Sequence, residues 1–335
     1  MMQQLEQEKE VLLAVREFIH SLNVDQKVVA DISMVVNETS QLSLSNLDAW
    51  ERIIRREMLR AEETSAPSMV KRWSRSARSV MWLDICSGDG FRREKTLRRI
   101  STGAPDSFFF ALAVRRLNDW VAQVREAARE KLQIIAEGTD PEHVVNALCA
   151  TLPHWNSWGR MEDADSQVLM KLISIDRVAE ALKSKIVSST CGPMASILVQ
   201  VGRTEILDRY LGEIAKNAVQ PSVRAKAYRC LLEGRMVWLS GRKWVWTDRQ
   251  WGKSRYEPVH GERAVYAENS FIEILKLAAS DRSAMVRRVA GELLIRELKV
   301  IGVEAIKLAE LLASDSSASV AERGKFALNR LESSL

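Results

Sequence analysis

The chain has 335 residues, 46% of them hydrophobic, and its formal net charge is +5 at pH 7. No apolar stretch reaches the roughly 18 residues that a membrane-spanning helix needs, so no membrane partner is expected. The four cysteines are far apart and form no C-x-x-C pair, and the first residues, MMQQLEQEKE, do not resemble a signal peptide. Isolated cysteines of this kind are typical of buried thiols in a reducing compartment, so we expect a cytoplasmic protein.

The first 65 residues are predicted to form an N-terminal helical cap or docking module. Apolar residues at helical spacing indicate three helices, at 3–22, 24–36 and 46–63. Residues 1–50 carry three Lys or Arg against eight Asp or Glu, so this module is acidic. A basic helix is expected next, over 67–85, and residues 71–99 carry nine Lys or Arg against three Asp or Glu.

From residue 90 onward the pattern predicts helices that alternate with short turns. Proline and glycine are sparse, with 7 and 15 residues, which favours helix almost throughout. The expected helices are 90–102, 105–117, 120–137, 140–152, 164–173, 175–187, 191–201, 203–217, 220–234, 266–279, 283–298, 302–313 and 317–333. Residues 153–163 are expected to form an irregular loop.

One phrase recurs along this part of the chain. An Asp is followed at fixed offsets by Val, Arg, a small residue and Leu, and the copies are Asp119–Leu132, Asp281–Leu294 and Asp315–Leu328, the last with Ala321 in place of Arg. Weaker copies contain Arg93 and Arg224 at the Arg position. Val, the small residue and Leu are four apart, so they share the buried face of a helix. The Asp precedes the helix, where its carboxylate can accept backbone N–H groups.

This phrase resembles the HEAT repeat, the helix-pair unit of armadillo-like α-solenoid proteins. The resemblance implies an all-α fold, a right-handed superhelix of helix pairs over residues 66–335. It also implies a ladder in which Asp and Arg side chains link neighbouring repeats, with one rung missing at Ala321. Such proteins mostly act through long exposed surfaces, so the resemblance says little about the partner.

An insertion interrupts the repeats near 235–265. Met236–Leu239 and Lys243–Thr247 are rich in β-forming residues and are separated by Ser240-Gly241, which predicts a β-hairpin that turns at those two residues. The segment contains four of the ten tryptophans, and residues 235–263 carry seven Lys or Arg against three Asp or Glu. Insertions of this kind often lie on the binding edge of a solenoid.

Two groups of residues are candidates for binding. The first is the tryptophans and cations of the hairpin, namely Trp238, Arg242, Lys243, Trp244, Trp246, Arg249, Trp251, Lys253 and Arg255. The second is a basic helix face, expected to lie on the concave side, with Arg92, Arg93, Arg98 and Arg99. Trp and Arg are common in protein–protein hot spots, and indole rings also stack on bases. The alternatives are that the tryptophans pack back on the helices, and that the arginines form a solvated face paired in part with Glu94 and Asp89.

No local motif indicates catalysis, a metal site or a cofactor, since the four histidines have no partners at metal-ligand spacing. We therefore expect a non-catalytic scaffold for a protein partner or for another copy of the chain. Nucleic-acid binding is the alternative. HEAT-like bacterial DNA glycosylases use Trp, Asp and Arg around the damaged nucleotide, and Trp244, Trp246, Asp248 and Arg249 offer similar residue types, although on a predicted hairpin.

Overall fold

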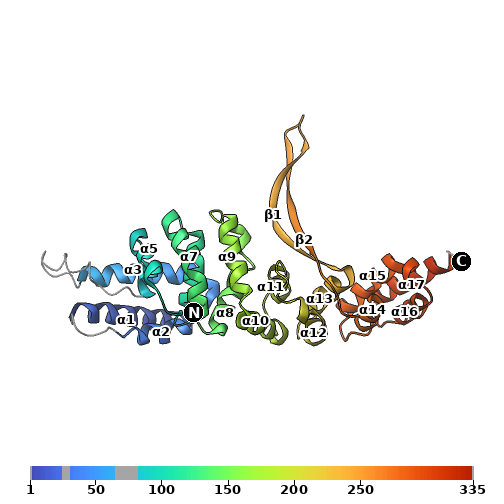
Figure 1. Cartoon of the computed structure of the whole chain (residues 1–335), viewed down its shortest axis with the longest axis horizontal. Helices are drawn as coiled ribbons and strands as arrows, with labels where there is room; N and C mark the ends of the chain where they lie inside the picture. Colours follow the sequence, from blue (N-terminus) through green and yellow to red (C-terminus); the bar gives the residue numbers. More distant parts are fainter. Residues whose placement is uncertain (1, 25–30, 65–81, 334–335) are drawn as a thin grey trace. The chain divides into compact units, whose positions relative to one another are not determined.

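The computed structural model describes residues 2–24, 31–64 and 82–333. The described chain is mostly helical and contains one antiparallel sheet of two strands (Figure 1). It divides into two compact units, Met1–Val178 and Ala179–Leu335. Among the described helices, none combines the length and the apolar character that a membrane crossing requires. The predicted boundary near residue 65 and the cytoplasmic location stay predictions.

The first unit is built from helices. They are α1 (Met2–Val24), α2 (Ser33–Ser40), α3 (Leu47–Thr64), α5 (Gly90–Arg99), α6 (Ser107–Arg115), α7 (Ala122–Gly138), α8 (Pro141–Thr151) and α9 (Asp163–Ile173). Short 3-10 helices lie at Leu44–Asn46, Trp82–Cys86, Arg116–Asn118 and Trp155–Ser157. Helix α10 (Asp176–Ser188) begins in this unit and continues into the second one.

The second unit contains the hairpin. Its elements are α11 (Met194–Val201), a 3-10 helix at Asp208–Tyr210, α12 (Leu211–Asn217), α13 (Pro221–Glu233), β1 (Arg235–Asp248), β2 (Lys253–Ala264), α14 (Phe271–Ala279), α15 (Ala284–Ile301), α16 (Glu304–Ala313) and α17 (Ala318–Glu332). Neighbouring helices pack in pairs, such as α12 with α13 and α16 with α17.

Most of the predicted helices are present, but three differ. The helix expected over 24–36 is α2, which begins only at Ser33, and the basic helix expected over 67–85 lies mostly outside the described residues. The helix expected over 203–217 is reduced to a 3-10 turn and α12. The reason is that Arg263 donates to the carbonyl oxygens of Gly202, at 2.7 Å, and Thr204, at 2.6 Å, so a side chain from β2 occupies groups that a longer helix would use.

The recurring phrase forms the buried face that its spacing predicts. Val124, Ala128 and Leu132 of α7 are fully buried. The small residue allows another helix to approach closely: a Cβ built on Gly324 of α17 would lie 2.1 Å from the backbone nitrogen of Ala313. The phrase therefore contributes a helix that buries its apolar stripe against its neighbours, although Leu328 of the last copy is only partly buried.

The arginine of the phrase makes the same contacts in several copies. Arg93 is 1% exposed, and its Nε and Nη2 donate to the two carboxylate oxygens of Asp119 at 2.9 and 2.7 Å. Its Nη1 donates to the carbonyl oxygen of Ser87 at 2.8 Å, which ties down the turn before its own helix. Asp119 in turn accepts the backbone N–H of Val121 at 3.0 Å. One arginine thus joins its own turn to the next one.

The second unit repeats this arrangement twice. Arg224 clasps Asp281 with two hydrogen bonds of 2.9 Å and donates to the carbonyl oxygen of Ala218. Arg287 clasps Asp315 at 2.5 and 2.9 Å and donates to the carbonyl oxygen of Asp281. These pairs are the kind of Arg–Asp contact that the resemblance implies. The series ends at α17, where Ala321 has no group to donate.

In the first unit the series is modified after Asp119. Arg125 donates to the carbonyl oxygen of Asp119 at 2.9 Å, as the phrase requires, but no Asp phrase follows it. Its guanidinium instead lies 3.6 Å from the carboxylate of Glu162, the residue just before α9. The irregular segment before α9 therefore replaces a clasped aspartate with a longer and more exposed ion pair.

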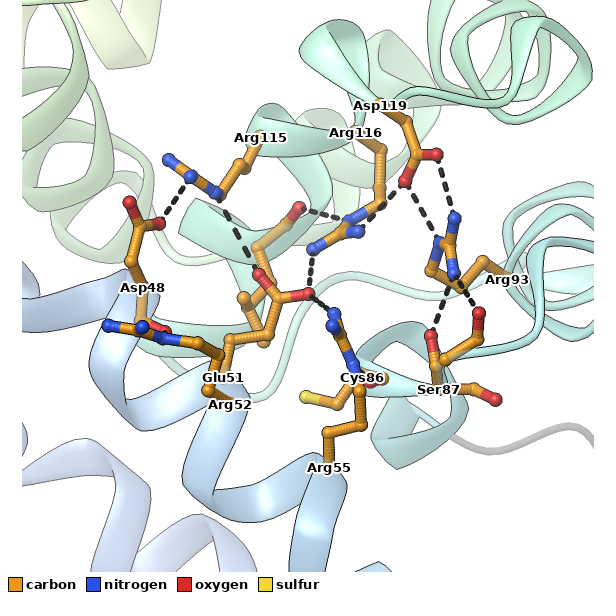
Figure 2. A network of polar contacts seen from close by, with 12 residues as sticks. Asp48, Glu51, Arg52, Arg55, Cys86, Ser87, Arg93, Arg115, Arg116 and Asp119 are labelled. Carbon is orange, nitrogen blue, oxygen red and sulfur yellow. Dashed lines mark hydrogen bonds and ion pairs between the residues drawn. The ribbon is translucent and has the colours of Figure 1, made fainter.

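A buried ionic network joins the N-terminal helices to these contacts. Figure 2 shows Glu51 of α3 among three arginines, with Arg116 between Glu51 and Asp119. Arg116 lies 2.6 Å from Glu51 and 2.9 Å from Asp119. Arg55 also contacts Glu51 and donates to the carbonyl oxygen of Cys86 at 2.9 Å. Since Glu51 and Asp119 are both buried, α3 is held by charge as well as by packing.

Removal of the Arg93 guanidinium tests the importance of the clasp. Arg93→Ala leaves the buried carboxylate of Asp119 with one arginine fewer, so we expect it to lower the free energy of unfolding by about 3–5 kcal/mol. Arg99→Ala, on the exposed side of the same helix, is the control and should change it by less than about 0.5 kcal/mol. Urea unfolding followed by circular dichroism measures both, and equal midpoints would contradict the role of the clasp.

The clasps also predict a loss of stability in acid. Burial alone would raise the pKa of Asp119, but hydrogen bonds from Arg93 and Val121 and the charges of Arg116 and Arg93 hold this pKa below its usual 3.8. The hydrogen bond from Arg287 lowers the pKa of Asp315 likewise. A lowered carboxyl pKa stabilises the folded state above the unfolded value, and this stability is lost as the pH falls below about 4. Urea midpoints at decreasing pH should fall steeply, and less so in Asp315→Asn.

Candidate binding hairpin

The hairpin branches from the helices without separating them. Helix α13 is followed by Gly234, whose φ of +63° ends the helix, and the backbone N–H of Val265 donates to the carbonyl oxygen of Gly234 at 2.9 Å. The chain thus leaves and returns at one point. Arg224 of α13 clasps Asp281, 57 residues later, across this insertion. The helices on its two sides therefore pack directly, and the hairpin is an added arm.

The base of the arm is anchored in the helices. Met236 is buried, its Sδ lies 3.3 Å from the Sγ of Cys230, and it covers Gly202 at the end of α11. Burial raises the pKa of the Cys230 thiol to about 11, so this sulfur is a neutral packing group. Arg263 of β2 adds a bidentate salt bridge to Asp208, with distances of 2.6 and 2.7 Å.

Trp238 also belongs to the anchored base. Its ring lies 5.8 Å from the guanidinium carbon of Arg203, which donates to the carbonyl oxygen of Leu239 at 2.9 Å. Burial lowers the pKa of Arg203 to about 10. On the other strand, a Cβ on Gly261 would lie 2.6 Å from the indole, so glycine provides the space for Trp238. Trp238 therefore contacts the segment after α11 and differs in this from the exposed tryptophans of the distal arm.

The predicted turn at Ser240-Gly241 is wrong. Both β-rich runs belong to the single strand β1, which pairs with β2, and the chain turns instead at Arg249–Gly252. Ser240 lies at a shift in the register, between Leu239, paired with His260, and Gly241, paired with Val259. It is thus an extra residue, a β-bulge. At the true turn, Asp248 accepts the backbone N–H groups of Gln250 and Trp251, and Gly252 has a φ of +61°.

The bulge changes which residues share a face. Side chains alternate along a strand, so without it Trp238 and Trp244 would lie on the same side. The register instead aligns Trp238 with Gly261 and Trp244 with Tyr256, which lie on opposite sides of β2. The distal part of the sheet therefore has an aromatic face, formed by Arg242, Trp244, Trp246, Ser254, Tyr256 and Pro258. Its opposite face is formed by Lys243, Val245, Arg255, Glu257 and Val259.

Beyond the anchored base, the aromatic side chains are exposed. Trp244 is 66% exposed, Trp246 57%, Trp251 at the turn 74% and Tyr256 52%. The rings of Trp244 and Tyr256 contact each other across the strands, with centroids 5.1 Å apart. In Figure 1 the distal half of β1 and β2 extends beyond the helices of its own unit. These three tryptophans therefore do not fix the arm to the helices.

The distal arm also carries an excess of positive charge. Its five cations are Arg242, Lys243, Arg249, Lys253 and Arg255, all of them exposed. Its two acids are already engaged: Glu257 accepts from Arg255 at 2.5 Å, and Asp248 holds the turn. The turn role of Asp248 also differs from the role that the glycosylase resemblance gives to an aspartate.

The predicted basic helix face is largely paired with acids. On α5, Arg92 contacts Asp84 and lies 3.0 Å from Glu62, while Arg93 is buried against Asp119. Arg98 contacts Glu94 at 2.9 Å, as the alternative interpretation expected, and also Glu126 and Glu130. Asp89 caps α5 by accepting the N–H of Phe91. Arg99 is exposed; it belongs to the first compact unit, and the cations of the hairpin belong to the second.

Three residues that hold the base of the arm have no signal of their own in the sequence. Arg203, Arg263 and Met236 fix its base, and only the buried surroundings that other elements supply distinguish them from ordinary surface or strand residues. In the described part of the chain, no group of three or more His, Cys, Asp or Glu side chains could hold a metal ion. Comparison of the chain with protein-family models, curated proteins and solved structures finds no match.

A glycine-to-alanine pair tests the anchor. A Cβ on Gly202 would lie 2.6–2.8 Å from three side-chain atoms of Met236, so Gly202→Ala should displace the arm base and cost about 1–3 kcal/mol. Gly212→Ala, in α12 with no atom within 4 Å of the new methyl group, should instead stabilise by about 0.4–1 kcal/mol. Urea unfolding distinguishes them, and a neutral Gly202→Ala would show that Met236 does not anchor the arm.

Proposed function

We propose that this protein is a non-catalytic binding scaffold, a HEAT-like α-solenoid whose hairpin holds a protein partner in a multi-protein complex. The observation that supports this most directly is the contrast along the arm, where the base is anchored by Met236, Trp238 and Arg263 and the distal half exposes Trp244, Trp246 and Trp251. We also propose that the protein is located in the cytoplasm and that the partner can be a second copy of the chain.

The repeated Arg–Asp clasps support the solenoid part of the proposal. Arg93, Arg224 and Arg287 each join the turn before their own helix to the aspartate of a later turn. Each of these arginines thereby fixes the following turn at the same point, as repeat proteins do by nearest-neighbour contacts. Within each compact unit, helices also pack in consecutive pairs.

The exposed rings support a contact function. Burying a large aromatic side chain stabilises a fold by about 1.5–3 kcal/mol, so leaving three tryptophans in water gives up a substantial gain. Exposed apolar patches of this kind usually mark interaction sites. Tryptophan and arginine are moreover the residue types richest in hot spots of protein–protein interfaces. A rigidly anchored strand pair can present them with little loss of conformational freedom on binding.

The placement of the charges favours a protein over a nucleic acid. A nucleic-acid surface needs a continuous track of free cations along the phosphates. On α5, Arg92, Arg93 and Arg98 are already paired with carboxylates. On the strands of the arm, one cation, Arg242, shares the aromatic face while Lys243 and Arg255 lie on the opposite face, so the cations do not form a continuous track along the stacking surface.

Loss of the two tryptophans on the aromatic face should weaken partner binding strongly. Trp244→Ala/Trp246→Ala removes most of the aromatic face without touching the base, so pull-down of the partner from source cells should fall at least about tenfold. The matched control is Phe91→Ala/Tyr266→Ala, which removes two aromatic rings exposed elsewhere, at 71% and 88%. Circular dichroism should show unchanged helix content in both variants.

A shortened arm and a nucleic-acid titration complete the test. Replacing residues 242–258 by Asn-Gly keeps the paired strand residues at the base of the arm, up to Gly241 and Val259, and should also release the partner. Retention of the partner by this variant would contradict the proposal. So would tight binding of oligonucleotides that weakens steeply as salt is raised to about 0.15 M, because this is the behaviour of phosphate contacts.

A further inference from the structure

A sheet of two strands has two edges, and each edge has backbone groups that point away from the other strand. In the described residues the sheet consists of β1 and β2 alone. Such edges are templates for a further strand, and proteins usually protect them. The two edges of this arm differ in a way that the register reveals.

The outer edge of β2 is interrupted by a proline. The hydrogen bond from the N–H of Val265 to Gly234 sets the alternation of the ladder, so odd-numbered residues of β2 direct their N–H and C=O groups toward β1. Pro258 then lies at a position whose N–H would point outward. Its missing N–H costs the hairpin no bond, but it removes a donor from the outer edge of β2.

The outer edge of β1 is uninterrupted in the same region. Gly241, Lys243 and Val245 pair with odd-numbered residues of β2 and so face that strand. The backbone groups of Arg242, Trp244 and Trp246 therefore point outward, in a strand without proline. Their side chains form the aromatic face beside this edge, so a strand added here would contact both the free backbone groups and the indole rings.

The charge of the arm indicates what kind of strand would add. The distal arm carries five exposed cations, of which Arg242 and Lys243 lie on β1 itself, whereas Asp248 is engaged in the turn and Glu257 with Arg255. A basic or neutral segment would leave this charge uncompensated. An acidic segment would be attracted to it, and its alternate apolar side chains could cover Trp244 and Trp246.

We infer that the edge of β1 over Arg242–Trp246 binds an extended acidic segment of the partner protein, which adds as a third strand of the sheet. This inference rests on the proposed function and specifies its mode. Backbone hydrogen bonds to β1 supply affinity, the aromatic face selects apolar side chains at every second position, and the cations select carboxylates. The edge of β2 is excluded because Pro258 interrupts it.

The probe is a library of random 12-residue peptides displayed on phage and selected on the whole protein. The expected peptides are rich in Asp and Glu that alternate with apolar or β-branched residues, and none should be retained by the variant with residues 242–258 replaced. Enrichment of basic or uncharged peptides would overturn the inference. Binding of a selected peptide that Trp244→Ala/Trp246→Ala leaves unchanged would overturn both the inference and the proposed function.

A proline at the edge separates strand addition from side-chain contact. Arg242→Pro removes an outward N–H and a charge, whereas Arg242→Ala removes only the charge. A selected peptide should bind Arg242→Pro about tenfold more weakly than Arg242→Ala, measured by fluorescence anisotropy. Equal affinities would overturn strand addition while leaving a protein partner for the aromatic face intact.

Hydrogen exchange provides a readout that does not depend on a variant. On peptide binding, the amide hydrogens of Arg242, Trp244 and Trp246 should exchange at least about tenfold more slowly, because they become bonded. Those of Lys243 and Val245, which already face β2, should change little. Protection of Tyr256 and His260 on the β2 edge instead would overturn the assignment to β1.

Discussion

The buried clasp between an arginine and an aspartate is the contact on which the helical part of this protein depends. In the clasps of Arg93 and Arg224 the guanidinium is almost fully removed from water, and its geometry is bidentate, which keeps the cost of burying two charges low. The same arginine binds the carbonyl groups before its own helix. Turn, helix and neighbouring turn are thereby set by one side chain, and Glu51 and Arg116 extend this arrangement to the N-terminal helices.

This constraint explains how the chain tolerates a long insertion. Arg224 and Asp281 meet although the hairpin lies between them in the sequence, so the arm leaves the clasp between α13 and the turn before α15 intact. The arm is in turn held by side chains of its own, Met236, Trp238 and Arg263, against α11 and the segment after it. The base of the arm is therefore held by packed and hydrogen-bonded side chains, whereas the side chains of the distal half are exposed to solvent.

The arm and the helices use arginine in opposite ways. On α5, Arg92, Arg93 and Arg98 form salt bridges with carboxylates of the chain itself. On the arm, cations outnumber acids, and the acids are engaged locally, so positive charge remains exposed beside free indole rings. The net charge of the whole chain does not reveal this difference, because it adds the paired arginines of α5 and the exposed cations of the arm together.

The sequence by itself determined the helical composition, the recurring phrase and the existence of a Trp-rich hairpin, because these depend on local spacing and on residue types with one dominant role, whereas the Arg–Asp contacts were implied only by the HEAT resemblance. The tertiary structure alone decided where the hairpin turns, since Ser240-Gly241 resembles a turn as closely as it resembles a bulge until β2 is seen to pair past it. It also decided which tryptophans are anchored and which arginines are neutralised. Those outcomes depend on partners far away in the chain, such as Asp119 for Arg93 and Gly202 for Met236, and local sequence does not encode such pairings.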